Sequence, residues 1–304
     1  MQKIERVLRH KRLCLALTGL TPDEFIRLLP VFTEILHRRK QKSYRDNPKR
    51  QRKNGGGRKG FLPSVADKLF FILFYYKCYP TYDVLAFFYG CNRANACRRQ
   101  FALSGILEAT LAKKLVLPQR QLKNVEDFLE AFPEAREVFI DGTERPIQRP
   151  KDKDKQKNNY SGKKKRHTRK NLIISTKQKR IGFLSRTVEG KQHDFTMLKT
   201  LAPPRCIPKN IKQHVDLGFK GYQAQYPDHR VSMPQRKPRN RDLPPTAKER
   251  NKRKSRVRVL VEHAIGGIKR LRITTDVFRN KRNGYDDTVM LLSCGLWNYH
   301  LATR

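Results

Sequence analysis

The chain has 304 residues, and its 68 Lys and Arg against 27 Asp and Glu give a formal net charge of +41 at pH 7. A charge excess of this size opposes compaction unless a polyanion neutralises it, which indicates a nucleic-acid partner. Hydrophobic residues make up 38% of the chain and 16 residues are Phe. This content excludes a disordered basic tail and predicts a folded nucleic-acid-binding protein with the length for two domains.

The cysteines are spread along the chain without a C-x-x-C pair. The nearest two, Cys91 and Cys97, have no His or Cys partner at zinc-finger spacing. We therefore expect reduced thiols and a cytosolic or nuclear compartment. The longest apolar run, LFFILFYY (69–76), is far shorter than the roughly 20 residues of a membrane span. No apolar leader follows Met1, so we expect neither a signal peptide nor a membrane partner.

Residues 13–37 are predicted to form a helix introduced by the letters TPDE. Thr21 is the expected N-cap, Pro22 the first helical residue and Glu24 the reciprocal acid of a capping box. The next segment, 38–60, carries 11 Lys or Arg and three consecutive glycines without apolar periodicity. This composition predicts a flexible arm, which either contacts DNA phosphates or only keeps the protein in solution.

The segment 63–112 is predicted to be a compact helical unit. Its first helix begins after Ser64 and stops at Pro80, a short helix ends at Gly90, and a third is capped by Asn92. The third helix carries the arginines Arg93, Arg98 and Arg99. A helix, a glycine turn and a basic second helix match the helix-turn-helix plan, whose second helix enters the major groove of DNA. An ordinary three-helix bundle with solvated arginines explains the pattern equally well.

After an acidic window at 122–137, which is the expected domain boundary, short apolar runs follow. VFIDGT (138–143) predicts a buried strand that ends in an Asp-Gly turn, and 171–190 predicts a hairpin. The basic segment 145–170 between them either handles target DNA or is a solvated loop. A helix, two strands, a long helix and a closing helix are then predicted at 193–202, 211–221, 229–234, 246–272 and 286–303. This succession predicts an α/β layered domain.

Three carboxylates are candidates for chemistry: Asp141 and Asp216 near predicted strand ends, and Glu262 on the long predicted helix. Ligands and metals collect at strand ends. Arg258, Glu262 and Lys269 are spaced by four and seven residues, which places them on one helical face. Three carboxylates beside cations fit metal-assisted phosphoryl transfer, in which the metal binds carboxylate oxygens and the cations hold the DNA backbone. The alternative is a chance trio, with Glu262 only neutralising its basic helix.

Four motifs, FIDGTE, GKQHDFTML, HVDLGFKGY and VEHAIGGIKR, occur in order between residues 138 and 300. They resemble the landmarks of the DDE transposases of bacterial insertion sequences, in the branch related to eukaryotic Harbinger-type elements. Residues 61–112 are more loosely similar to the helix-turn-helix domain that precedes them in that family. The family signature around the third acid is Tyr-x2-Arg-x3-Glu-x6-Lys. Arg258, Glu262 and Lys269 fit it, while Ser255 stands at the tyrosine position.

The resemblance implies an α/β, RNase H-like catalytic domain with a mixed sheet and flanking helices, preceded by an all-α helix-turn-helix domain. The implied domains are an N-terminal helix with a basic arm, the helix-turn-helix domain, an acidic linker helix and the catalytic domain, at 1–60, 61–120, 121–137 and 138–304. Asp141, Asp216 and Glu262 become catalytic residues and ligands of two Mg²⁺ or Mn²⁺ ions. Among rival acids, Glu144 is expected to support Asp141, and Asp194 to cap its helix rather than bind metal.

The function implied is that of a transposase, which binds the terminal inverted repeats of its element and then cuts and joins DNA strands. Arg258 and Lys269 are expected to contact DNA at the catalytic site, and the three arginines of the helix-turn-helix to contact the element end. Joining two ends implies a homodimer or higher assembly on double-stranded DNA, in the cytoplasm at the nucleoid. The alternative is an inactive or host-adopted DNA-binding protein of the same architecture. A hydrolase of RNA–DNA hybrids fits less well, because A-form grooves do not admit a recognition helix.

Overall fold

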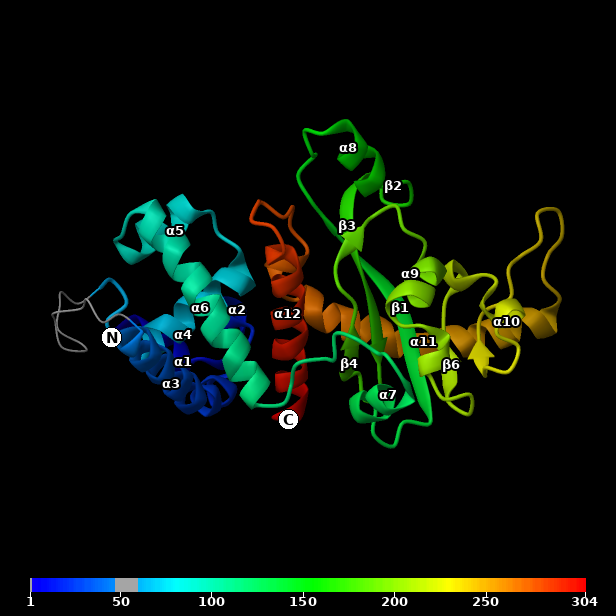
Figure 1. The fold of residues 1–304 in the computed structure, drawn as a ribbon, viewed down its shortest axis with the longest axis horizontal. Coiled ribbons are helices and arrows are strands. Elements are labelled where there is room, and N and C mark those ends of the chain that lie inside the picture. Colours follow the sequence, from blue (N-terminus) through cyan, green and yellow to red (C-terminus); the bar gives the residue numbers. More distant parts are fainter. Residues whose placement is uncertain (1, 47–59) are drawn as a thin grey trace. The chain divides into compact units, whose positions relative to one another are not determined.

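The computed structural model describes residues 2–46 and 60–304 (Figure 1). These residues form two compact units, each described here by itself. The N-terminal unit comprises Met1–Val116 together with two short downstream segments, Arg270–Ile273 and Tyr299–Arg304. The sheet unit comprises Leu117–Lys269 and Thr274–Asn298. No helix within the described ranges is long and apolar enough to cross a membrane.

The N-terminal unit is built from helices, and the three N-caps predicted for them are confirmed. Its helices are α1 (Gln2–Arg9), α2 (Lys11–Thr18), α3 (Pro22–Arg45), α4 (Val65–Cys78), α5 (Tyr82–Tyr89) and α6 (Arg93–Lys113). Thr21 and Glu24 form the predicted capping box, with the Glu24 amide donating to the Thr21 hydroxyl at 3.2 Å and the Thr21 amide to the Glu24 carboxylate at 2.7 Å. Ser64 and Asn92 cap α4 and α6 as predicted.

Two predictions for the first sixty residues are wrong. The single helix expected at 13–37 is two helices, because Gly19 ends α2 in the left-handed conformation (φ 77°), which favours glycine. Helix α3 continues to Arg45, so the beginning of the expected flexible arm is helical. The remainder of that arm, residues 47–59, lies outside the described residues.

Glu24 also ties distant segments of the chain into the N-terminal unit. The ring of His300 lies 2.5 Å from Glu24 Oε1, and the Tyr299 hydroxyl donates to the Glu24 carbonyl oxygen at 2.9 Å. Burial opposes ionisation of Glu24, but the His300 ring, the Thr21 amide and the charges of His300 and Arg270 hold its pKa below the ordinary value. This carboxylate therefore fixes the end of α12 (Tyr285–Ala302) to the start of α3.

The sheet unit contains a mixed sheet in the order β2-β3-β1-β6-β7, with β4 and β5 also pairing with β3. Its strands are β1 (Glu137–Pro146), β2 (Tyr160–Ser161), β3 (Arg166–Ser175), β4 (Ile181–Leu184), β5 (Val188–Glu189), β6 (Lys212–His214) and β7 (Val231–Ser232). Strand β1 is antiparallel to β3 and parallel to β6, and β6 is parallel to β7. The predicted hairpin is therefore present as β3 and β4, which pair antiparallel.

Helices cover both faces of this sheet. The helices of this unit are α7 (Val125–Ala131), α8 (Lys153–Asn159), α9 (Asp194–Leu201), α10 (Tyr222–Gln225) and α11 (Pro245–Lys269), with 3₁₀ turns η1 (Pro204–Cys206) and η2 (Leu217–Phe219). A further 3₁₀ turn, η3 (Arg272–Thr274), follows α11 in the chain. Val138 and Ile140 of β1 share a core with Phe128 of α7 and Leu198 of α9. Alternate side chains of a strand point to opposite faces, and α11 packs on β1 and runs behind the strands in Figure 1.

The structure corrects the predicted end of β1 and excludes one of the two alternatives for the segment after it. The strand does not end at Asp141 and Gly142 but continues to Pro146, paired with β3 throughout. The segment 145–170 is not a solvated loop, because it contains α8, β2 and the first part of β3. Arg145 and Lys170, at its two ends, are buried.

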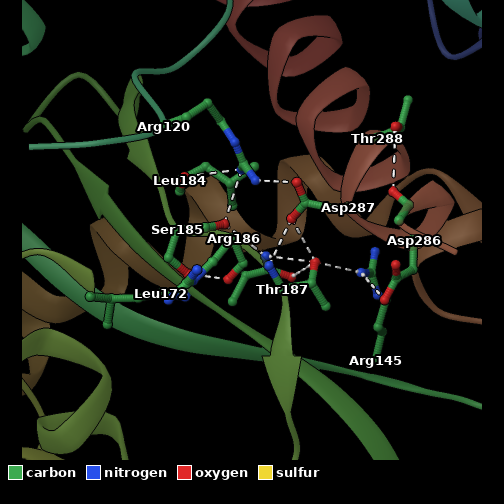
Figure 2. A network of polar contacts seen from close by, with 12 residues as sticks. Arg120, Arg145, Leu172, Leu184, Ser185, Arg186, Thr187, Asp286, Asp287 and Thr288 are labelled. Atoms are coloured by element: carbon green, nitrogen blue, oxygen red, sulfur yellow. Dashed lines mark hydrogen bonds and ion pairs between the residues drawn. The ribbon is translucent and has the colours of Figure 1, made fainter. Parts of the chain in front are cut away.

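Figure 2 shows a polar network that fastens the start of α12 to the sheet. Arg120 forms an ion pair with Asp287 and donates to two backbone carbonyls at the end of β4, at 3.0 and 2.9 Å. Asp287 also accepts hydrogen bonds from the amide and hydroxyl of Thr187, at 2.7 and 2.9 Å. The buried Arg145 lies 3.7 Å from Asp286 and donates to the Thr187 hydroxyl at 3.1 Å. Each of these acids is therefore opposed by an arginine.

Candidate active site

Asp141 and Asp216 are brought together by the pairing of two parallel strands. Phe139 of β1 pairs with His214 of β6, and each aspartate lies two residues beyond its member of this pair. Asp141 is held within β1, whereas Asp216 follows β6 and caps η2, accepting a hydrogen bond from the Gly218 amide at 2.7 Å. The two carboxylates therefore leave adjacent strands side by side.

The electrostatics of Asp141 reflect this proximity. Burial and then the charge of Asp216 raise the pKa of Asp141 to about 6, against the opposing effects of Arg258 and of the Gly142 amide, which donates to Asp141 at 2.7 Å. Within the described part of the chain, neither Asp141 nor Asp216 forms an ion pair. Two carboxylates in close proximity without a bound cation favour protonation of one of them.

Helix α11 presents the third predicted acid. Arg258 and Lys269 both interact electrostatically with Asp141. Glu262 lies between them on the same helical face and is exposed. On the packed side of the helix, the Trp297 ring covers Gly267, where an added Cβ would lie 2.3 Å from it. A Cβ at Gly266 would meet open space, so this part of α11 is accessible to a large ligand.

The structure thus joins two of the three predicted acids and directs the helix face of the third toward them. Over residues 2–46 and 60–304, no three His, Cys, Asp or Glu side chains are arranged as a ready set of metal ligands. Repulsion among like charges opposes the close approach of three ionised carboxylates unless a cation is present. The donors are nevertheless the hard oxygen ligands that Mg²⁺ takes, and the raised pKa of Asp141 marks a position where added positive charge is favourable.

Asp194 is a neighbour of this site that the sequence interpretation misassigned. It does not cap α9, whose N-terminus has no side-chain cap. Its carboxylate instead occupies a slot between two glycines: an added Cβ would lie 2.4 Å from it at Gly142 and 2.5 Å from it at Gly218. These glycines follow Asp141 and Asp216 closely in the sequence. The sequence did contain a signal for this arrangement. A glycine shortly after each of the two candidate acids indicates that another group packs against the backbone at that position.

Lys170 holds Asp194 in this slot. Its ammonium lies 3.0 Å from the Asp194 carboxylate, 3.4 Å from that of Glu144, and 3.0 Å from the carbonyl oxygen of Gln192. Glu144 also accepts a hydrogen bond from the Thr168 hydroxyl at 3.0 Å. Glu144 and Lys170 are paired across β1 and β3, so the predicted supporting acid points to this lysine.

The arginines predicted to contact DNA through the N-terminal unit are exposed at the start of α6. Helix α5 ends at Gly90, in the left-handed conformation (φ 62°), and α6 begins three residues later. Arg93 forms an ion pair with Asp83 at 3.7 Å, and both side chains are more than 70% exposed, so solvent screens the pair. Arg98 donates to the Asn95 side chain at 2.8 Å, and Arg99 is also exposed.

Residues 140–298 match the family model of the DDE superfamily endonucleases. The chain belongs to this family. Residues 61–113 match the helix-turn-helix of DDE superfamily endonucleases. A probable transposase for insertion sequence element IS702 from Microchaete diplosiphon is 30% identical over 242 residues, which cover 79% of this chain and 82% of that protein. No solved structure matches the chain.

These matches confirm the predicted family and the predicted fold class, a mixed α/β domain behind an all-helical helix-turn-helix domain. They also decide for a helix-turn-helix over an ordinary three-helix bundle in the N-terminal unit. The protein is therefore a transposase-like, nuclease-type enzyme with a domain that binds DNA. Endonucleases of this superfamily generally depend on divalent metal ions.

Proposed function

We propose that this endonuclease is a transposase that cuts and joins DNA at the ends of its own element. Asp141, Asp216 and Glu262 are the proposed catalytic residues and ligands of Mg²⁺ or Mn²⁺, with two ions in each site. The observation that supports this most is the position of Asp141 and Asp216 at two adjacent parallel strands, β1 and β6, where burial and then the charge of Asp216 raise the pKa of Asp141 to about 6.

In the bound state, divalent ions would supply charge stabilisation to the attacking and leaving oxygens of an in-line displacement at phosphorus. The chain's own residues have distinct tasks around that centre. Asp141 and Asp216 fix the position of the scissile phosphate relative to the sheet, and Glu262 approaches it from α11. Arg258 and Lys269, which interact with Asp141, hold the DNA backbone on either side of Glu262 without competing as metal ligands.

The N-terminal unit has the task of recognition in this proposal. Helix α6 enters the major groove of a terminal inverted repeat, with Arg93, Arg98 and Arg99 contacting the element end. Cleavage frees a 3′-hydroxyl, and that hydroxyl attacks target DNA in the joining step, so no covalent protein intermediate is needed. Because two element ends are joined, the assembly on DNA is at least a dimer.

A nicking assay on DNA carrying the candidate inverted repeats tests this function. In Mg²⁺ or Mn²⁺, Asp141→Asn, Asp216→Asn and Glu262→Gln are each expected to slow cleavage by more than about a thousandfold, because each removes several kcal/mol of metal-dependent stabilisation. DNA affinity should change little. The matched control is Asp228→Asn, which alters an exposed aspartate paired with an exposed lysine, Lys209. Undiminished cleavage by all three variants would contradict the assignment.

A DNA-binding protein of the same architecture without cleavage activity is the second candidate. It is favoured by one observation, that the three carboxylates do not form a ready set of metal ligands in the described residues. The same assay separates the two candidates. Specific binding to element ends without cleavage in either metal supports the second, and metal-dependent nicking that requires Asp216 supports the first.

A further inference from the structure

A cleft of about 590 Å³ opens beside Asp216 in the sheet unit. Its base is formed by Glu144, Lys170 and Asp194, which are already engaged with one another. The rest of its lining comes from three other places: β2 and the turn after it, the loop between β5 and α9, and η2. The function proposed above assigns no role to this cleft. Asp216 nevertheless lines the cleft and is also one of the proposed catalytic residues.

The polar groups of the cleft that remain available suit a nucleotide. Lys163 and Lys191 are exposed and contribute two ammonium groups from separate loops. Gln192 and His193 are exposed as well and add an amide and an imidazole, which hydrogen-bond the edges of bases. A nucleotide needs cations to bind its phosphate and hydrogen-bonding groups to bind its base. The cleft offers both kinds of group.

Two exposed apolar side chains also line the cleft, Tyr160 from β2 and Leu217 from η2. They are 45% and 46% exposed, in a part of the sheet unit where most large apolar groups are buried. The Tyr160 ring is braced edge-to-face by the ring of His167, with centroids 5.7 Å apart. Residue 160 is also paired with residue 167 in the β2–β3 ladder, so the ring is presented from a fixed backbone.

We propose that this cleft receives one unpaired nucleotide of the DNA next to the scissile phosphate. The base stacks on Tyr160 against Leu217, and Lys163 and Lys191 hold the flanking phosphates. This inference rests on the proposed function, since Asp216 is what places the scissile phosphate at the mouth of the cleft. The volume lies in the range of pockets for ligands of nucleotide size, and aromatic stacking of this kind accepts any base.

The nucleotide has to be unpaired, because a base inside a duplex is covered on both faces by its neighbours and cannot reach a cleft wall. The cleft therefore gives the enzyme a preference for DNA that is frayed or distorted at the cut. A free mononucleotide presents the same base and phosphate, but it lacks the duplex that the rest of the protein binds. The two sources are separable by experiment.

Fluorescence of 2-aminopurine tests the proposal on the full-length protein in Mg²⁺. The background is Glu262→Gln, so that binding is read without cleavage. The probe is an element-end duplex whose last three nucleotides at the cut site are unpaired and carry one 2-aminopurine. Stacking on Tyr160 is expected to quench this probe, and a fully paired duplex with the same label should not change on binding.

Variants of the cleft supply the decisive comparison. Tyr160→Ala should abolish the quenching and weaken binding of the frayed probe by about fivefold to a hundredfold, the range measured for loss of one stacked base. Tyr160→Phe should retain both. The double change of Lys163→Ala with Lys191→Ala should also weaken binding of the frayed probe, whereas Lys123→Ala, an exposed lysine that does not line the cleft, should have no effect.

Equal quenching by Tyr160→Ala and its parent protein would overturn the proposal. Quenching of free 2-aminopurine deoxynucleotide as strong as that of the frayed probe would also overturn it, in favour of a mononucleotide site. Failure of the proposed function is recognised separately, as cleavage by the Glu262→Gln background or absence of cleavage by the wild-type protein. The quenching result is read in either case, because it requires only binding.

Discussion

The sheet unit holds two groups of acids that differ in how their charge is balanced. Asp286 and Asp287 face arginines, and Asp287 also accepts two hydrogen bonds from Thr187. Asp141 and Asp216 face each other, and no ion pair neutralises either of them in the described part of the chain. The first group is balanced from within the fold, whereas the second favours a cation from outside.

The arginines near these acids also differ in whether their charge is balanced within the fold. Burial lowers the pKa of Arg145 to about 10, against the opposing charges of Asp286 and Asp287, so its charge is committed to the network in Figure 2. Arg258 interacts with Asp141 but forms no ion pair with it and stays available for a phosphate. A basic residue in a DNA-binding enzyme is therefore not by itself a DNA contact, and its burial decides between the two roles.

The largest expected effect comes from removing the charge of Asp141 in metal-free protein. Its folded pKa is raised to about 6, so between about pH 4 and pH 6 the folded state binds more protons than the unfolded chain, and stability is lost as the pH rises. Asp141→Asn should remove this loss and be more stable than wild type above about pH 6, by up to about 3 kcal/mol.

Urea unfolding in EDTA measures this difference through Trp297, the single tryptophan of the chain, which lies in the sheet unit. The two proteins should be alike at about pH 3, below both the folded and the unfolded pKa, where the unfolded carboxyl is also largely protonated. Equal stability at neutral pH would show that neither burial nor the charge of Asp216 destabilises ionised Asp141 in the folded protein.

Removing an acid of the balanced group should have the opposite sign. Asp287→Ala removes the ion-pair partner of Arg120 and leaves the Thr187 amide without its acceptor, so the free energy of unfolding of the sheet unit should fall by about 2 kcal/mol. Asp228→Ala, which breaks the exposed and solvent-screened pair with Lys209, should leave the free energy of unfolding nearly unchanged. A smaller loss for Asp287→Ala than for this control would refute the distinction.

A change at Asp194 sharpens the comparison, because this acid is balanced by Lys170 yet adjoins the unbalanced pair. Asp194→Asn should slow cleavage by about tenfold to a hundredfold, the usual cost of losing a group that orients metal ligands. The dependence of the cleavage rate on Mg²⁺ distinguishes an orienting role of Asp194 from a purely structural one. If Asp194 orients the metal ligands, the variant should need a higher Mg²⁺ concentration than the wild type for its half-maximal rate. An unchanged Mg²⁺ requirement with a lower melting temperature would assign Asp194 to stability alone.

The smallest effect is expected for the cations of α11. Arg258→Ala and Lys269→Ala should each reduce the slope of log affinity against log salt concentration by about one, since each removes one of the proposed phosphate contacts. Binding measured at several salt concentrations on one element-end duplex gives this slope. Arg256→Ala provides a comparison on the same helix, and a slope reduced equally by all three would mean that α11 binds DNA without a defined face.

Local signals in the sequence were sufficient for much of this fold. Thr21, Ser64 and Asn92 could be assigned as caps because a side-chain acceptor before a helical run satisfies amides that the helix leaves free. Asp141 and Asp216 could be selected because each follows a run of apolar residues typical of a buried strand. Their proximity was not in the pattern, since it depends on the parallel pairing of β1 with β6.

Long-range packing explains the predictions that were wrong. An Asp-Gly pair is usually a turn signal, but in β1 Gly142 is needed because the Asp194 carboxylate occupies the space of a side chain. Asp194 itself follows His193 at the start of a helix, where an acid is commonly a cap. Only the folded arrangement, in which Lys170 reaches it from β3, reveals its other partner.

The bond between Glu24 and His300 spans 276 positions of the chain. Because the residues near position 300 complete the packing around the start of α3, a chain cut short before that point lacks the contacts that close the helix-turn-helix unit. Such truncated chains should yield little folded protein able to bind DNA. A full-length protein would therefore face weak competition for DNA from its own truncated forms.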